Sequence, residues 1–215
     1  MEKKTILEAL KKIRETKRKF KQSVDIVINL KNIDIKKDAA NLEFYIPLTH
    51  PTGKKIKVAA FVGPELIEQA KDACDIAIAS SDFDAYEKDK KKLKKLASTH
   101  DYFIAQATIM PKVATTFGRI LGPKGKMPNP KAGCVIPPNA NVEQVVKRLQ
   151  NLIKLSAKKE VIFSCSVGVE DMDDNHIFDN VMTVYNQVIH HLPQEKNNIR
   201  SVFLKLTMSK AERID

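Results

Sequence analysis

The pattern of apolar residues changes type twice along this chain of 215 residues, and this change constrains its fold most. Between residues 24 and 30, apolar and more polar residues alternate, which predicts a strand with one buried face. The same alternation returns at residues 161–167 and 201–208. Residues 55–156 instead alternate short apolar runs with helical segments, a pattern typical of parallel strands joined by crossover helices.

This order predicts a mixed α/β and α+β chain of two domains. Residues 1–54 and 157–215 are expected to form one discontinuous α+β domain that holds both termini, and residues 55–156 an inserted α/β domain. We also expect a strand at 42–48 to pair antiparallel with the strand at 24–30. The last helix of the insert is expected to reach about residue 155, so that connections near 53–55 and 155–159 form a hinge.

Charge and composition narrow the class of protein. The net charge of +11 favours polyanions as partners, with acidic substrates second. No apolar run approaches the roughly 20 residues that cross a bilayer, and the N-terminus is charged throughout, so we expect a cytoplasmic chain without a membrane partner. Three cysteines at irregular spacing fit neither a disulfide framework nor a zinc site.

Two basic clusters could contact nucleic acid. The first, at residues 14–21, surrounds Phe20, and it predicts either a phosphate-binding edge or a solvated helix end with Phe20 in the core. The second is a lysine run at residues 88–95 with few aromatic residues. Such a run is more often a solvated helix face than a nucleic-acid contact.

The Gly/Pro-rich stretch at residues 118–133 is basic and irregular, with four glycines and three prolines. A phosphate loop ending at Lys126 would need glycine at 120 and Ser or Thr at 127, where the chain has Ile120 and Met127. The acidic residues at 170–174 fail the calcium-loop pattern and are explained by helix capping. We therefore predict no catalytic residues, no metal site and no cofactor, and a protein that is not an enzyme.

Several stretches together resemble one known family. The sequence LGPKGKMPNPKAG at residues 121–133 closely resembles the signature of the ribosomal protein L-one family, the mobile-stalk protein of the large ribosomal subunit. RKFKQSVDIVINLK, DYFIAQATIMP, SVGVEDMDDNHIFDN and LKLTMSK follow in family order across nearly the whole chain. The segments FIAQA and GKMP resemble the sequences of archaeal members more than those of bacterial ones.

The resemblance implies that the insert is Rossmann-like and that the split domain is the principal RNA-binding surface. It implies binding to large-subunit ribosomal RNA at the base of the stalk, as a monomer within the large ribosomal subunit. In the family, stalk movement assists the release of transfer RNA from the exit site. Many members also repress translation by binding their own messenger RNA.

The resemblance also implies site residues, carried over by matching motifs. On the first strand and its approach these are Lys19, Phe20, Lys21, Ser23 and Asp25. On the last strand and the turns they are Gly168, Lys205, Thr207, Met208 and Ser209. Ser209 departs from the glycine that family members usually carry, which puts a close backbone approach to RNA in doubt.

Some interpretations stay open on the sequence alone. Phe20 and Met208 could present flat apolar surface to RNA or pack in the core at strand ends. Lys124, Lys126 and Lys131 could make secondary contacts to ribosomal or transfer RNA, or serve only the loop's own fold and interdomain closure. The rival classes are a nucleotide-dependent or other small-molecule enzyme built on the α/β insert, and a general basic RNA chaperone without a fixed site.

Overall fold

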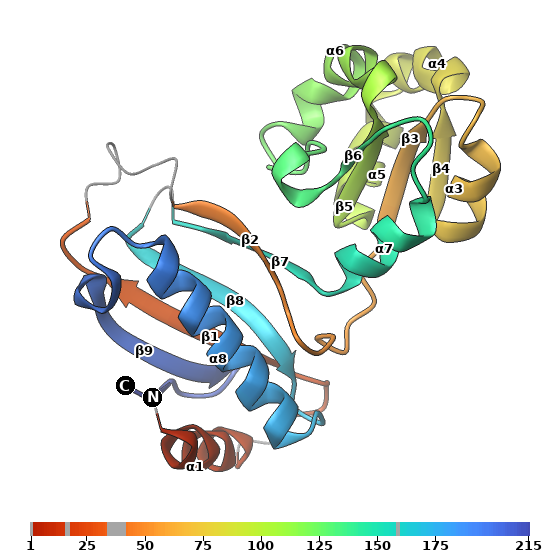
Figure 1. Cartoon of the computed structure of the whole chain (residues 1–215). Helices are drawn as coiled ribbons and strands as arrows, with labels where there is room; N and C mark the ends of the chain where they lie inside the picture. Colours follow the sequence, from red (N-terminus) through yellow and green to blue (C-terminus); the bar gives the residue numbers. More distant parts are fainter. Residues whose placement is uncertain (1, 16–17, 34–41, 158–159) are drawn as a thin grey trace. The chain divides into compact units, whose positions relative to one another are not determined.

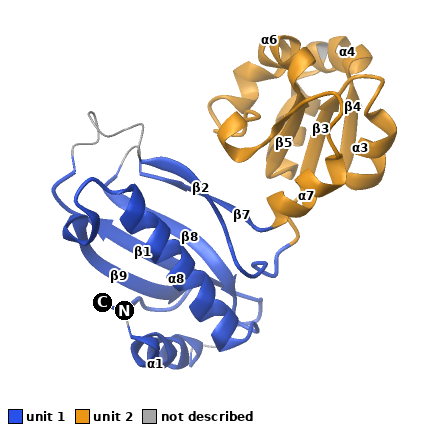
Figure 2. Cartoon of the chain, viewed as in Figure 1, with its two compact units in different colours: residues 1–54, 151–215 blue, residues 55–150 orange. Residues whose placement is uncertain are grey.

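A computed structural model describes residues 2–15, 18–33, 42–157 and 160–215. The chain divides into two compact units, shown in Figure 2. Unit 1 comprises residues 1–54 and 151–215, and unit 2 comprises residues 55–150. Helices, antiparallel strands and parallel strands are all present, which confirms the mixed α/β class.

Unit 1 contains a four-stranded antiparallel sheet, visible in Figure 1. Its strands, in spatial order, are β10 (Glu212–Arg213), β9 (Ile199–Leu206), β1 (Ser23–Leu30) and β8 (Ile162–Val169). The central strand β1 pairs with β8 on one side and with β9 on the other. Three segments far apart in sequence therefore meet in one sheet.

Two helices supply the core of unit 1. Helix α8 (Asp174–His191) lies across one face of the sheet, and α1 (Lys3–Arg14) packs against β9, β10 and α8. Their apolar stripes meet the even-numbered side chains of β1, from Val24 to Leu30, in one buried cluster. Asp25, Val27 and Asn29 lie on the opposite face and are only partly buried, while Ser23 is buried; among the described residues, α1 and α8 both pack on the even-numbered face.

Two expectations about residues 42–156 are wrong. Strand β2 (Glu43–Pro47) pairs with β7 (Leu152–Ser156) rather than with β1, and both belong to unit 1. Helix α7 (Val142–Gln150) ends at Gln150, before the expected residue 155, and β7 follows at once. Leu149, Leu152 and Ile153 fit helical spacing equally well, so the pattern alone could not separate the helix from the strand.

Unit 2 is built on a parallel sheet. In spatial order its strands are β4 (Ile76–Ala79), β3 (Val58–Val62), β5 (Tyr102–Gln106) and β6 (Val135–Ile136). Its other helices are α3 (Ile67–Ala73), α4 (Phe83–Lys88), α5 (Lys90–Thr99) and α6 (Met110–Leu121). Every residue of β3 is buried, as expected for the centre of a parallel sheet.

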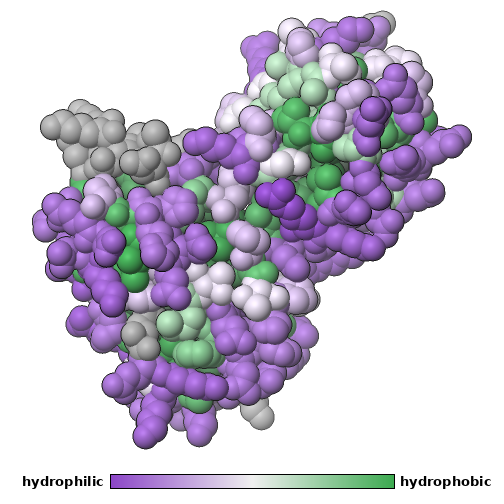
Figure 3. Space-filling model, viewed as in Figure 1, coloured by the Kyte–Doolittle hydropathy of each residue, from purple (hydrophilic) through white to green (hydrophobic). Residues whose placement is uncertain are grey.

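Hydrophilic residues predominate on the visible side of each unit in Figure 3, with hydrophobic residues showing between them. In the part of the chain that the structure describes, no helix combines the length and the apolar character needed to cross a bilayer.

Candidate nucleic-acid interface

The face of the unit 1 sheet opposite α8 carries charged and polar side chains near one end of β1. Asp25 pairs in register with Ser166 of β8 and with Lys205 of β9. A register shift between Val24 and Asp25 interrupts the β1–β8 ladder at this point. The regular β1–β9 register at this end of β1 brings the sequence-predicted Asp25 and Lys205 together.

The pKa of the Asp25 carboxyl is altered by this arrangement. Burial raises the pKa of its carboxyl above the ordinary value of 3.8. Lys205 and Lys54, together with a hydrogen bond from Ser166, oppose this rise without cancelling it. Asp25 thus lies in the positive field of two lysines, which favours its charged form.

The start of β1 and the end of β9 are joined by hydroxyl groups. Thr207 Oγ1 lies 3.2 Å from Ser23 Oγ and accepts a hydrogen bond from the Ser23 backbone N–H at 3.3 Å. The Lys54 ammonium donates to Ser23 Oγ at 3.2 Å. The Lys205 ammonium donates to the Thr207 carbonyl at 3.1 Å. The buried Ser23 hydroxyl therefore links the exposed residues Thr207 and Lys54.

Sequence reasoning missed Gln22 and Lys54. Gln22 is fully buried, accepts the Met208 backbone N–H at 3.1 Å and donates to Glu170 at 3.2 Å. Lys54 reaches Ser23 across 31 residues of sequence. Their partners are distant in the chain, and nothing local to either residue indicates the contact.

Phe20 and Met208 are large apolar residues left in solvent. Phe20 is 51% exposed and Met208 is 57% exposed. The alternative that these two side chains pack in the core is therefore wrong. Exposed aromatic and apolar side chains beside cations are the features on which RNA bases and sugars pack.

Ser209 fixes the turn that follows β9. Its hydroxyl accepts the Leu206 N–H at 2.8 Å and donates to the Lys210 carbonyl at 2.9 Å. Positive φ is found at only two non-glycine residues in the described chain, Asn32 and Glu195, so Ser209 needs no glycine-like conformation. A serine in place of the glycine that the resemblance implies is accommodated, because its side chain folds back onto its own turn.

The basic segment before β1 is held by the acidic residues at 170–174. Lys21 forms an ion pair with Asp171 at 3.0 Å, and Arg14 pairs with Asp174. Asp173 caps α8 by accepting the Asn175 N–H at 3.4 Å, which agrees with the capping interpretation. Lys19 is exposed near this segment. We call Lys19–Asp25 together with Lys205–Ser209 the β1–β9 surface.

The remaining predicted residues lie elsewhere. Gly168 is buried opposite Val24, and a Cβ there would lie 2.9 Å from the Met172 sulfur, so packing beneath α8 accounts for this glycine. In unit 2, the Lys126 ammonium donates to the His100 carbonyl at 2.6 Å and the Lys124 ammonium to Ser98 Oγ at 2.7 Å. Both loop lysines thus bond the C-terminal end of α5.

Lys131, the third loop lysine, is exposed at the loop's short 3₁₀ turn. Its backbone N–H donates to the Asn129 side chain at 2.9 Å, which begins that turn. The structure therefore explains two of the three loop lysines by local folding and leaves the third ammonium in solvent.

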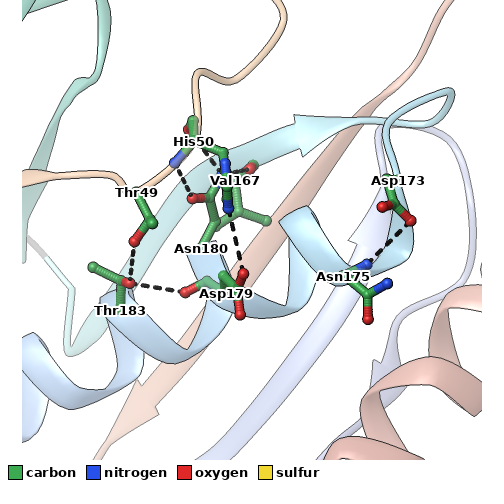
Figure 4. A network of polar contacts seen from close by, with 8 residues as sticks. All are labelled: Thr49, His50, Val167, Asp173, Asn175, Asp179, Asn180 and Thr183. Carbon is green, nitrogen blue, oxygen red and sulfur yellow. Dashed lines mark hydrogen bonds and ion pairs between the residues drawn. The ribbon is translucent and has the colours of Figure 1, made fainter.

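A polar network fixes the segment that leaves β2 toward unit 2 (Figure 4). Asn180 of α8 is fully buried, accepts the His50 N–H at 3.0 Å and donates to the carbonyls of His50 and Val167 at 3.0 and 2.8 Å. Thr49 and Thr183 hydroxyls lie 3.0 Å apart, and His50 contacts Asp179 at 3.3 Å. This network also anchors the segment that carries Lys54.

The usual nucleotide position of a parallel sheet is blocked in unit 2. Ligands of such sheets bind at the carboxyl ends of the strands where the strand order reverses, here between β3 and β5. The buried Gln106 side chain occupies this point, accepting the Gly63 N–H at 2.8 Å and donating to Glu65 at 3.3 Å. The position of the Gln106 side chain therefore gives no support to the hypothesis of a nucleotide-dependent enzyme.

Metal and thiol chemistry have no evident site in the described residues, where no cluster of three or more His, Cys, Asp or Glu residues is arranged to hold a metal ion. The three cysteines are free. Burial raises the pKa of Cys74 and Cys134 to about 11 and that of Cys165 to about 12. All three are protonated at neutral pH and are poor nucleophiles.

Comparison with known proteins agrees with this arrangement. The chain is 44% identical to large ribosomal subunit protein uL1 of Nanoarchaeum equitans over 213 residues, covering 97% of this chain and 98% of that protein. The proteins of the same name from Methanobrevibacter smithii and Pyrococcus horikoshii are 36% and 35% identical, covering 97% and 98% of this chain and 98% and 95% of theirs. Residues 10–210 match the Ribosomal protein L1p/L10e family, and the chain belongs to this family.

Proposed function

We propose that this protein is a structural component of the large ribosomal subunit in the cytoplasm and binds large-subunit ribosomal RNA through the β1–β9 surface. Family membership supports the ribosomal role, since the relatives are named large ribosomal subunit proteins. One observation carries the site. Phe20 and Met208 are exposed beside lysines and hydroxyls that β1 and β9 bring together.

The chemistry of this surface suits RNA. Lys19, Lys21 and Lys205 can neutralise phosphates, which makes affinity depend on salt. The exposed Thr207 hydroxyl, which Ser23 holds in place, can exchange hydrogen bonds with ribose 2′-hydroxyls in a shallow minor groove. A surface that combines both kinds of group can hold RNA and also distinguish its shape.

The proposal extends to the finer roles that the family resemblance implies. The RNA site is the junction at the base of the stalk, and the protein acts there as a monomer without a cofactor. We further propose that it assists release of transfer RNA from the exit site and represses translation by binding its own messenger RNA. Units 1 and 2 serve as the RNA-binding domain and the inserted Rossmann-like domain, with residues 151–156 in the former.

Binding to an RNA fragment that contains the stalk-base junction, against a scrambled RNA of equal length, tests this function. Affinity is measured for both RNAs with the full chain across a salt series. We expect a preference for the junction that persists as salt rises, because hydroxyl and apolar contacts are screened less than phosphate contacts. Equal affinities at high salt would support the general RNA chaperone instead.

A nucleotide titration distinguishes the proposed RNA-binding protein from a nucleotide-dependent enzyme. A nucleotide-dependent protein should gain thermal stability in proportion to the logarithm of ligand concentration above its Kd. With Gln106 filling the strand-end position, we expect ATP to leave the unfolding of unit 2 unchanged. A saturable stabilisation of unit 2 would favour the enzyme.

A further inference from the structure

A groove of about 760 Å³ lies on unit 1, next to the β1–β9 surface. On one side it is lined by Lys12, Ile13, Glu15 and Arg18, and on the other by Met208, Ser209, Lys210 and Glu212. Small-molecule sites typically measure roughly 300–1,000 Å³, so the groove has room for one nucleotide. The predicted RNA contacts account only for its rim at Met208 and Ser209.

The groove is lined by three cations, Lys12, Arg18 and Lys210. Lys12 forms an ion pair with Glu212 at 3.7 Å. Arg18 and Lys210 form no ion pair with any residue whose placement is described. These two cations are therefore available to a phosphate group.

An apolar surface faces the same space. Met208 lines the groove with its exposed side chain, and Ile13 contributes a buried one. The backbone of Met208 is held by Gln22, so the side chain projects from a fixed point. A polarizable thioether packs well on a flat aromatic ring, which makes Met208 a support for a nucleic-acid base.

Glu15 supplies a hydrogen-bond acceptor in the groove. A carboxylate accepts from the exocyclic amino group of cytosine, whereas uracil presents an oxygen at that position. This residue therefore favours a base that carries an amino group there.

Contacts hold the described residues at the end of α1 and in the turn after β9. Arg14 ties the end of α1 to Asp174 and donates to the Met172 carbonyl at 2.8 Å. On the other side, Ser209 holds the turn through its two hydrogen bonds.

We propose that this groove receives one unstacked nucleotide of the bound RNA. Its phosphate lies against Arg18 and Lys210, its base packs on Met208, and Glu15 accepts from the base's amino group. The proposal rests on the RNA-binding function proposed above and extends it, because it assigns α1 and the residues after it a part in recognition.

Free nucleotides test the groove without RNA. Cytidine monophosphate, uridine monophosphate and inorganic phosphate are titrated into the full chain while backbone amide resonances of Ile13 and Met208–Lys210 are followed by NMR. We expect saturable shifts for cytidine monophosphate and weaker ones for the other two. Equal shifts for all three ligands would show that the groove binds anions without recognising a base. No shifts would show that it binds none of them, and either outcome overturns the proposal.

Substitutions then test the groove with RNA. Arg18→Gln with Lys210→Gln is compared with Lys4→Gln with Lys11→Gln, which removes the same charge from exposed positions of α1 outside the groove. For the stalk-base fragment, we expect the groove variant to lose at least about tenfold in affinity and to lower the salt slope by about two. The control should change little.

The outcomes separate this proposal from the proposed function. If the groove variant matches its control while the wild type still prefers the stalk-base RNA, the groove is not part of the interface and the ribosomal function stands. If the wild type binds both RNAs equally, the ribosomal function fails. A groove that still takes cytidine monophosphate would then be a free-nucleotide site, which contradicts the present proposal.

Discussion

The two units use their sheets in opposite ways. In unit 1 the antiparallel sheet buries one face under α8 and keeps polar and charged side chains such as Asp25 and Lys205 on the other. In unit 2 the central strand β3 of the parallel sheet is entirely buried, and Gln106 fills the strand-end crevice. Both faces of a parallel sheet are usually buried in the core, whereas an antiparallel sheet can leave one face exposed to a binding partner. This difference supports the proposal that unit 1 makes the RNA contacts.

The largest expected effect comes from Asn180, whose amide bonds three backbone groups of unit 1. Asn180→Leu leaves those buried groups unpaired and should lower the free energy of unfolding by about 2–4 kcal/mol. Hydrogen exchange measured by mass spectrometry should show lost protection in unit 1 and unchanged protection in unit 2. Asn186→Leu, at an exposed position of α8, is the control. Equal loss in both units would show that they unfold as one.

The next largest expected effect is a loss of specific RNA binding when the side chains proposed to recognise the RNA are replaced. Thr207→Ala with Met208→Ala should cost about 1–3 kcal/mol of specific binding and leave the salt slope unchanged. Lys19→Gln with Lys21→Gln should lower that slope by about two, since each lysine contacts one phosphate. Both are measured by titration of the stalk-base RNA at several salt concentrations.

A matched pair in unit 2 sharpens this comparison. Lys91→Gln with Lys94→Gln removes the same charge from the exposed face of α5. We expect its affinity and slope to stay near those of the wild type. A slope change equal to that of the Lys19 and Lys21 variant would place phosphate contacts in unit 2 as well.

Lys126 should affect stability rather than binding. Lys126→Met removes the ammonium that caps the C-terminal carbonyl of α5, and we expect unit 2 to lose about 1 kcal/mol. RNA affinity should not change. Lys131→Met, at an exposed ammonium of the same loop, should leave stability unchanged. A tenfold loss of RNA affinity in either variant would make the Gly/Pro-rich loop a nucleic-acid contact.

The smallest expected effect is a pH dependence from Asp25. Its pKa is raised in the folded chain, mainly by burial, so its contribution to folded stability is more favourable at low pH and is lost as pH rises through the folded pKa. Protonation also removes a negative charge facing RNA. Acidification should therefore raise RNA affinity more in the wild type than in Asp25→Asn. If RNA affinity changes equally with pH in the wild type and in Asp25→Asn, protonation of Asp25 does not affect RNA binding.

Local patterns could be predicted from the sequence, and long-range pairings could not. The alternation at residues 24–30 and the Lys3–Arg14 helix follow from periodicity within one element. The pairing of β2 with β7 joins segments more than a hundred residues apart and has no local pattern. Sequence motifs likewise predicted Thr207 and Met208 as site residues. Gln22 and Lys54 could not be predicted, because they bond Met208 and Ser23, which are distant from them in the sequence.

The assignment of RNA recognition to unit 1 is tested most directly by hydrogen exchange of the full chain, free and bound to the stalk-base RNA. We predict new protection of backbone amides at residues 19–25 and 205–210, and unchanged exchange at residues 90–99 and 118–133. Protection concentrated in those two segments of unit 2, with the β1–β9 surface exchanging as in the free chain, would contradict the assignment.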